Sequence, residues 1–122
     1  MSKKILVVED TEDNRQILRD LLGMAGYEMV EAHDGAQGVA MAAEHRPDLI
    51  LMDIQMPVLD GYEATRRIKA APALAASPIV AVTSYALSGD EQKARDAGCN
   101  DYIAKPYSPR QMLAKVREIL GG

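Results

Sequence analysis

The sequence predicts an α/β domain in which five parallel strands alternate with five helices. Short apolar runs recur along the 122 residues, and each is followed by a longer amphipathic segment. The runs are continuously apolar, which indicates strands that are covered on both faces. Because βαβ crossovers are right-handed, this alternation gives a doubly wound (βα)₅ sheet between two helical layers.

The five strands are expected at the apolar runs. In chain order they lie near residues 5–8, 27–30, 49–52, 79–82 and 102–104. The third run, Leu49-Ile50-Leu51-Met52, contains no polar residue. It is therefore expected to be a strand that helices cover on both faces.

The five helices are bounded by residues that start or stop a helix. Gly26 ends the first, because glycine adopts the left-handed backbone of a helix end. Asp34 caps the second, and the third spans about Gly61–Ala70. A polar fourth helix lies near Gly89–Ala97, and Ser108-Pro109 opens the fifth. The inward-facing residues expected in the first and last helices are Ile17, Leu18, Leu21, Leu22, Met112, Leu113, Val116, Ile119 and Leu120.

Composition excludes several functional classes. The length fits one domain over residues 1–122. A net charge of −4 argues against direct nucleic-acid binding, which favours a basic face. No apolar run is long enough to span a membrane, so we expect a cytoplasmic protein without membrane insertion. The single cysteine, Cys99, is expected to be a small buried hydrophobe rather than a nucleophile.

Polar residues collect where the predicted strands end. Glu9 and Asp10 follow the first strand, Asp53 the third, Thr83 the fourth and Lys105 the fifth. The carboxyl ends of parallel strands meet at one edge of the sheet, where open α/β sheets bind ligands. If the strand order is 2-1-3-4-5, the strands that carry the three acids flank the point where the topology reverses.

This set of side chains suits phosphoryl transfer. Three adjacent carboxylates repel each other unless a cation lies between them, and their oxygens favour Mg²⁺ or Mn²⁺. Lys105 offers a compact positive charge to one phosphoryl oxygen, and Thr83 offers a hydroxyl to another. A carboxylate can itself accept the phosphoryl group as an acyl phosphate. Taken alone, each of these residues is explained at least as well by an ordinary structural role as by a role in phosphoryl transfer. Such roles are a helix cap, a turn or a hydrogen-bonded hydroxyl at the end of a strand.

The motifs resemble the receiver domain of response regulators. They are Val8-Glu9-Asp10, Asp48-Leu49-Ile50-Leu51-Met52-Asp53, Met56-Pro57, Asp60-Gly61, Val82-Thr83-Ser84 and Asp101-Tyr102-Ile103-Ala104-Lys105-Pro106. They cover essentially the whole chain in order, and the chain is similar in particular to single-domain regulators without an output module. The resemblance implies a flavodoxin-like sheet of order 2-1-3-4-5. It implies a phosphorylation-activated switch of a bacterial two-component or phosphorelay system, and not an enzyme.

The resemblance also implies a role for each site residue. Asp53 would accept the phosphoryl group from a histidine kinase or a histidine phosphotransfer protein, while Thr83 and Lys105 would bind its oxygens. The Lys105-Pro106 bond would be cis. The ligands of Mg²⁺, or of Mn²⁺ in its place, would be Glu9 (mostly through a water), Asp10, Asp53 and the backbone carbonyl of Gln55.

Tyr102 would be the switch aromatic, moving inward as Thr83 moves toward the phosphoryl group. A half-buried core tyrosine is a compatible interpretation, because the switch is a choice of rotamers. Inverting a 1:99 equilibrium needs about 5.5 kcal/mol of differential stabilisation, which new hydrogen bonds to the phosphoryl group can supply in part or in full. Downstream partners would dock on the fourth helix, fifth strand and fifth helix, and phosphodonors nearer the first helix, from Asn14 to Met24.

Two variable positions of the family are expected to border the path of a hydrolytic water. Gln55 lies two residues after Asp53, and Tyr85 lies two residues after Thr83. We expect the bulky Tyr85 to shield the acyl phosphate and to slow autodephosphorylation, and an unchanged rate in Tyr85→Ala would refute this. A surface contact with a partner is an equally weighted role for Tyr85.

Three other interpretations are weaker. A phosphatase of the haloacid dehalogenase type needs a second acid two residues after its nucleophile, and Gln55 cannot donate that proton. A flavin-binding electron carrier needs a phosphate loop where Glu9-Asp10-Thr11-Glu12-Asp13 would repel phosphate. A receiver cut from a longer protein is the third; the start at Met1 favours a free-standing chain, although Gly121-Gly122 could begin a linker. The kinase, output partner, pathway, oligomeric state and phosphoryl lifetime are not determined.

Overall fold

Strands and helices alternate along the chain as the sequence predicts. A computed structural model describes residues 3–54, 59–83 and 90–121. The strands are β1 (Lys4–Val8), β2 (Glu28–Ala32), β3 (Leu49–Asp53), β4 (Ile79–Thr83) and β5 (Asp101–Ala104). The helices are α1 (Glu12–Met24), α2 (Gly35–His45), α3 (Gly61–Ala70), α4 (Asp90–Ala97) and α5 (Pro109–Leu120).

The five strands form one parallel sheet in the order β2-β1-β3-β4-β5, which confirms the predicted topology. The order of the strands reverses between β1 and β3, so these two neighbours end at the topological switch point. Strand β2 begins and ends later than predicted. It continues to Ala32 because its ladder to β1 extends to the Val8–Ala32 pair.

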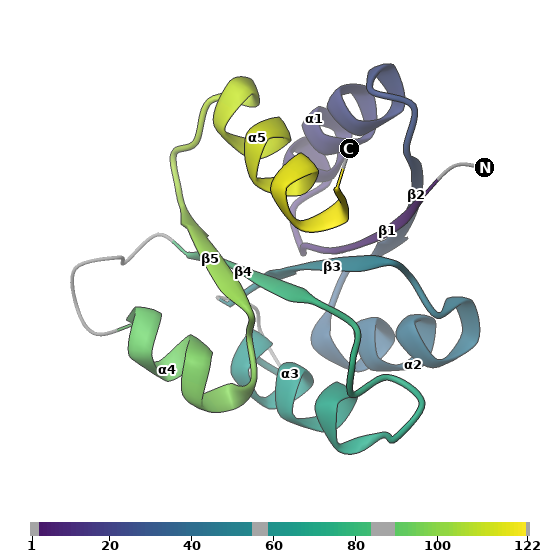
Figure 1. Cartoon of the computed structure of the whole chain (residues 1–122), viewed down its shortest axis with the longest axis vertical. Helices are drawn as coiled ribbons and strands as arrows, with labels where there is room; N and C mark the ends of the chain where they lie inside the picture. Colours follow the sequence, from purple (N-terminus) through teal and green to yellow (C-terminus); the bar gives the residue numbers. More distant parts are fainter. Residues whose placement is uncertain (1–2, 55–58, 84–89, 122) are drawn as a thin grey trace.

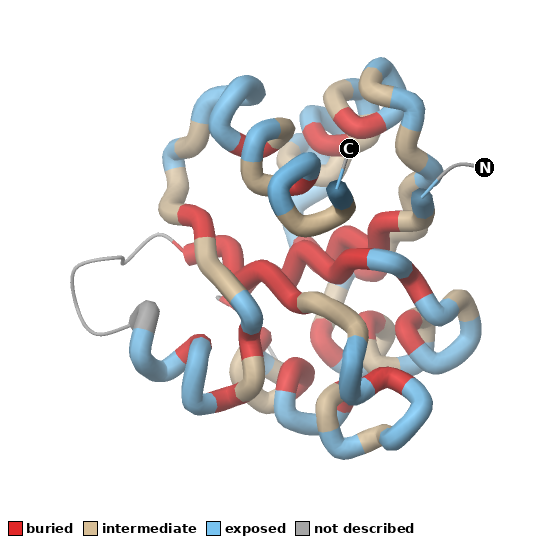
Figure 2. The backbone as a smooth tube through the Cα atoms, in the orientation of Figure 1, coloured by how far each residue is buried: buried red, intermediate tan, exposed pale blue. Residues whose placement is uncertain are grey.

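The sheet lies between two helical layers (Figure 1). Helices α1 and α5 cover one face, and α2, α3 and α4 cover the other. The side chains of β1 divide between the two cores, since successive residues of a strand point to opposite faces. Ile5 and Val7 pack on the α1–α5 side, whereas Leu6 and Val8 pack on the other. The central strands are buried along their length, as the tube in Figure 2 shows.

Side-chain caps begin three of the helices. The Asp34 carboxylate accepts a hydrogen bond from the Gln37 amide at the start of α2. Ser108 and Gln111 cap α5 reciprocally, with Pro109 in the first turn. Asp60 caps α3. The predicted caps at Asp34 and Ser108 are confirmed, and Gly26 has the positive φ expected after α1.

One predicted core residue lies at the surface instead. Leu18 and Leu22 of α1 are buried, but the Ile17 residue is 53% exposed. Ile17 precedes Leu18 by one residue, which is about 100° around a helix of 3.6 residues per turn, and this places it beyond the buried stripe. Cys99 is buried with a free thiol, as expected. Within the described ranges, no helix has the length and apolar character needed to cross a membrane.

Candidate functional site

The carboxyl ends of β1 and β3 bring three acids together. Glu9 and Asp10 follow β1, and Asp53 is the last residue of β3. One carboxylate oxygen from each of the three residues lies within 4.8 Å of the others. Because β1 and β3 are neighbours in the sheet, this convergence follows from the strand order that the sequence predicts.

Lys105 reaches the same point from the end of β5. Its Nζ lies 3.1 Å from Glu9 Oε1 and 3.5 Å from Asp53 Oδ2. The Lys105 amide donates to the carbonyl of Thr83 at 2.7 Å, which places Thr83 at the same edge of the sheet. The peptide bond between Lys105 and Pro106 is cis, as the resemblance implies.

The site is buried on one side and open on the other. Glu9 and Asp53 are each 4% exposed and Thr83 is 2% exposed, whereas Asp10 is exposed to solvent. A hydrated cation could therefore meet Asp10 from solvent and the two buried acids from within. Gly61 packs directly against the backbone of Asp53, because a Cβ atom there would collide with the carbonyl of Asp53. Only glycine lets α3 begin this close to the end of β3.

Hydrogen bonds fix the orientation of Glu9. Its carboxylate accepts from the Thr11 amide at 3.1 Å and from Asn14 Nδ2 at 3.2 Å. Lys105 Nζ is the third donor, at 3.1 Å. The side chain is therefore held as a carboxylate on the wall of the site.

The charges of the cluster are unevenly stabilised. Burial acts to raise the pKa of Glu9, but its hydrogen bonds with Thr11, Asp10, Asp53 and Lys105 lower that pKa below its ordinary value. The pKa of Asp10 is raised, first by partial burial and then by the adjacent Glu9 carboxylate. Burial opposes the charge of Lys105, yet Asp53 and Glu9 raise its pKa overall. One ammonium thus faces more negative charge than it can neutralise.

The donor set fits a magnesium ion. Carboxylate oxygens are the ligands that Mg²⁺ prefers, and the converging acids with a single lysine leave a local excess of negative charge. The remaining predicted ligand, the backbone carbonyl of Gln55, lies outside the described residues, and so does Tyr85. The structure therefore brings together Glu9, Asp10, Asp53 and Lys105, with Thr83 at the same edge, and leaves Gln55 and Tyr85 unplaced.

Tyr102 lies on β5 opposite Ala81 of β4. It is half-buried and packs against the core beneath α2, α3 and α4. This placement agrees with the half-buried core role and leaves the switch role a prediction.

Sequence reasoning missed the neighbours of the site. Asn14, in the first turn of α1, contacts Glu9, and Tyr107 follows the cis-proline. Burial raises the pKa of Tyr107 above its ordinary value. With Ile17, Lys105 and Pro106, these residues line a surface hollow of about 510 Å³. The signal for Asn14 was its position, because the first turn of a helix after a site loop faces back to that loop.

Comparison with known proteins agrees with this geometry. Residues 5–117 match the model of the family described as "Response regulator receiver domain". The chain is 42% identical over 121 residues to the polar-differentiation response regulator DivK of Brucella anthropi, covering 99% of this chain and 98% of that relative. DivK of Brucella ovis is 41% identical over the same length.

Solved structures show the same fold. The receiver domain of the sensor histidine kinase PA1611 from Pseudomonas aeruginosa superimposes with a TM-score of 0.93, at 39% identity and over 100% of both chains. That structure holds a magnesium ion coordinated in its active-site cleft. The chemotaxis protein CheY4 of Vibrio cholerae has a TM-score of 0.93 at 28% identity, covering 98% of this chain and 99% of its own.

Proposed function

Because this chain belongs to the response regulator receiver domain family of two-component signalling, we propose that it is a phosphorylation-activated switch whose acceptor is Asp53. One observation carries the proposal. The buried Asp53 carboxylate lies beside the Lys105 ammonium and within a cluster of two further acids. Burial alone would favour the protonated form of an aspartate, whereas the Lys105 ammonium beside Asp53 favours the carboxylate and offers a charge to a phosphoryl oxygen.

Mg²⁺ would be held by Asp10 and Asp53, with Glu9 acting mostly through a coordinated water and Gln55 contributing its backbone carbonyl. When bound, the ion neutralises the acids and the charge of the incoming phosphoryl group. Mn²⁺ is expected to substitute, because it takes the same oxygen ligands. The magnesium ion in the related receiver domain of PA1611 supports this choice of metal.

Phosphoryl transfer would place one oxygen of Asp53 on the phosphorus of a donor phosphohistidine. The O–P bond forms as the P–N bond breaks, and the electron pair of that bond returns to the imidazole nitrogen, which takes up a proton. Lys105 Nζ, 3.5 Å from Asp53 Oδ2, would hold one phosphoryl oxygen, and the Thr83 hydroxyl another. The protein assists this transfer and its own later dephosphorylation, and we do not class it as an enzyme.

The donor would be a histidine kinase or a histidine phosphotransfer protein docking beside α1. The hollow of about 510 Å³ supports this side, because it is lined by Asn14 and Ile17 of α1 and by Lys105 of the site itself. Ile17 offers exposed apolar surface there, at 53% exposure. Such a partner meets the protein in the cytoplasm, where we place its action.

The output would come from the face formed by α4, β5 and α5. Movement of Thr83 toward the phosphoryl group would let Tyr102 move inward and change this face. A second hollow, of about 420 Å³ and lined by residues of β5 and α5, supports a docking role for that part of the face. That hollow is lined by Ile103, Ala104, Pro106, Gln111, Ala114, Lys115 and Glu118.

Small-molecule phosphorylation tests the acceptor. The protein is incubated with Mg²⁺ and acetyl phosphate, and its intact mass is measured. Wild type is expected to gain the mass of one phosphoryl group and Asp53→Asn to gain nothing. Asp13→Asn, on the exposed side of α1, is the matched control and should label like wild type. An unlabelled wild type, or equal labelling of Asp53→Asn, would refute the proposal.

A further inference from the structure

Arg15 of α1 binds the main chain of the acidic loop. Its Nη1 donates to the backbone carbonyl of Glu9 at 2.7 Å. Its Nη2 donates to Glu12 Oε2 at 2.6 Å, and its Nε lies 3.4 Å from Glu31 Oε1. The side chain is only 12% exposed, so the guanidinium is largely withdrawn from solvent while all of these bonds form. Charge-assisted hydrogen bonds of this kind are stronger than neutral ones.

The carbonyl that Arg15 holds belongs to the peptide that joins two of the three acids. The peptide unit between Glu9 and Asp10 is planar, so fixing its oxygen fixes the orientation of the whole unit. The Cα atoms of both acids lie in that plane. A donor on the Glu9 carbonyl therefore restrains the directions in which both carboxylates leave the chain.

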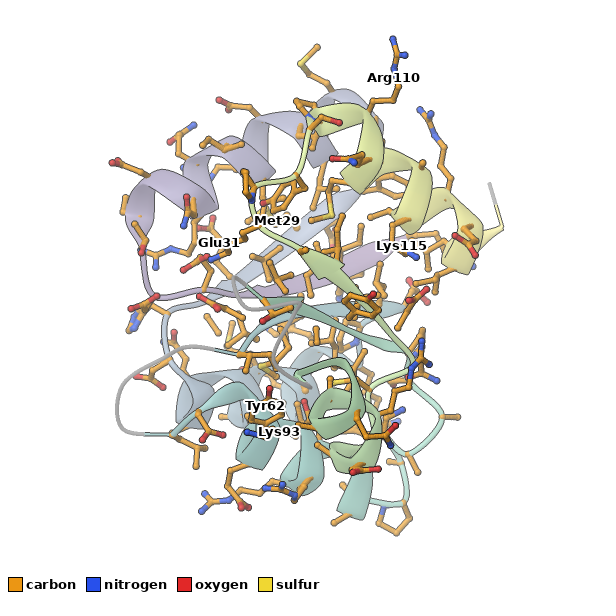
Figure 3. All side chains as sticks on the ribbon, turned by 90° about the vertical axis from the view of Figure 1, so that its left-hand side faces the viewer. Met29, Glu31, Tyr62, Lys93, Arg110 and Lys115 are labelled. Carbon is orange, nitrogen blue, oxygen red and sulfur yellow. The ribbon has the colours of Figure 1, made fainter. Side chains whose placement is uncertain are left out.

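Glu31 anchors Arg15 to the sheet. Glu31 and Met29 lie two residues apart on β2 and point to the same face, on the side that packs against α1 (Figure 3). Glu31 also accepts from Arg19 at 2.8 Å and 2.6 Å. The Arg15 guanidinium thus links a strand of the sheet to the loop that carries the acids.

Arg19 provides a natural comparison. It lies one helical turn after Arg15 and shares its acidic partners, Glu12 and Glu31. Arg19 is more exposed, at 38%, and its hydrogen bonds reach the side chains of Glu12, Gln16 and Glu31 rather than the main chain of the acidic loop. The two arginines therefore differ in the contact that matters here, the carbonyl of Glu9.

We propose that Arg15 is a positioning residue for the Mg²⁺ pair Glu9 and Asp10, acting through the Glu9 carbonyl. This inference rests on the proposed function, because it assumes that the acids bind Mg²⁺. Arg15 contacts the main chain of Glu9, so it would act on the ion only through the two acids. Its role is to keep the β1–α1 loop in a conformation that binds the ion.

The test is a titration of ¹⁵N-labelled protein with MgCl₂, followed through the backbone amide signals of the β1–α1 loop. Arg15→Met is expected to weaken Mg²⁺ binding by about 10-fold, at the lower end of the effect of residues that orient metal ligands. Arg15→Lys keeps one donor for the Glu9 carbonyl but loses the planar fork that also reaches Glu12 and Glu31, so it should bind Mg²⁺ more tightly than Arg15→Met and less tightly than wild type. Arg19→Met should bind like wild type. Urea unfolding of each variant measures the accompanying loss of stability.

A purely structural role predicts another result. It would weaken Mg²⁺ binding in Arg15→Met and Arg19→Met alike, or in neither, and either outcome would overturn the inference while leaving the proposed function intact. If Arg15→Met does not fold, equal Mg²⁺ affinity of Arg15→Lys, Arg19→Met and wild type would overturn it. A wild type that binds no Mg²⁺ would overturn both. Acetyl phosphate labelling of Asp53 in the same preparations separates loss of metal affinity from loss of the acceptor.

Discussion

The two edges of the sheet use charge in opposite ways. At the amino ends of the strands, the ammonium of Lys69 is matched by oxygen acceptors from three residues: Ala75 O at 3.2 Å, Ser77 O at 2.6 Å and Asn100 Oδ1 at 3.2 Å. At the carboxyl ends, Lys105 is the ammonium placed among three clustered acids. The amino edge is therefore satisfied within the protein, whereas the carboxyl edge is not.

This difference separates stability from function on one sheet. Pairs at the amino edge, such as Asp101–Lys115 at 2.8 Å, join the start of a strand to a helix that covers the sheet. The acids of the carboxyl edge repel each other until a cation arrives, so the folded state carries a cost that ligand binding relieves. We expect substitutions at the amino edge to change stability independently of Mg²⁺, and those at the carboxyl edge to change it in a Mg²⁺-dependent way.

The largest effect is expected from Lys105→Met. The substitution leaves Glu9 and Asp53 buried without the lysine that pairs with them. Removing one partner of a buried ion pair lowers the unfolding free energy by about 3 kcal/mol. Urea unfolding near neutral pH without divalent ions measures the loss, and added MgCl₂ should recover part of it. The control is Lys93→Met on the exposed surface of α4, expected to change stability by less than about 0.5 kcal/mol. Equal losses in the two variants would contradict the comparison.

Lys69→Met tests the satisfied edge. It removes hydrogen bonds from a charged donor to Ala75, Ser77 and Asn100, and we expect a loss of about 1.5 kcal/mol. Burial lowers the pKa of Lys69 below its ordinary value. The loss should be the same with and without Mg²⁺. Arg67→Met, which removes an exposed ion pair with Glu63 at 3.4 Å, is the control and should lower the unfolding free energy by less. A Mg²⁺-dependent loss in Lys69→Met would contradict the distinction between the two edges.

Asp101→Asn tests the ion pair of the amino edge through the pH dependence of stability. Burial acts to raise the pKa of Asp101, but hydrogen bonds from Lys115 and the Tyr102 amide lower it overall. A lowered pKa contributes stability that is present above the unfolded value of about 3.9 and is lost as pH falls through the folded value. The unfolding free energy of wild type should exceed that of Asp101→Asn by about 1 kcal/mol at neutral pH, and the two values should converge in acid. Urea unfolding across that pH range measures the gap, and a gap that persists in strong acid would exclude the ion pair as its cause.

The smallest effect, of opposite sign, is expected from Asp10→Asn. The pKa of Asp10 is raised, so the folded state holds its proton more tightly and loses stability as pH rises from the unfolded to the folded pKa. Neutralising Asp10 should therefore raise stability at neutral pH without metal, by about 0.5 kcal/mol after allowing for solvent screening. Asp13→Asn should not share this gain. Thermal unfolding with and without MgCl₂ measures both, and Mg²⁺ should then stabilise Asp10→Asn less than wild type.

Much of the fold was readable from local patterns. The run Leu49–Met52 marked a fully buried strand, and Asp34 and Ser108 marked helix starts through their side-chain acceptors. The prediction that Ile17 faces the core was wrong, because the spacing of apolar residues alone does not locate the edge of the buried face of a helix. The end of β2 was placed too early, because its length depends on pairing with β1, a neighbour 20 or more residues away in the chain.

The candidate site was predictable only as a set. Glu9, Asp10, Asp53 and Lys105 are polar residues at strand ends, and parallel strands bring such ends to one edge. The residues that orient them were not predictable in this way. Nothing in the local sequence distinguishes Arg15 from Arg19, since both are arginines of one amphipathic helix, one turn apart. They differ only in what each one reaches.

The sequence by itself determined the order of the elements and the chemistry at the ends of the strands, because both depend on patterns within a few residues. The tertiary structure decided which groups form ion pairs and hydrogen bonds with each other. Lys105 contacts both Glu9 and Asp53, and Arg15 donates to the Glu9 carbonyl. These contacts depend on side-chain reach and burial. Close ion pairs and hydrogen bonds form over a few ångströms. A pattern along the chain therefore indicates which side chains reach the same edge of the sheet, and only the packed structure determines which of them are in contact.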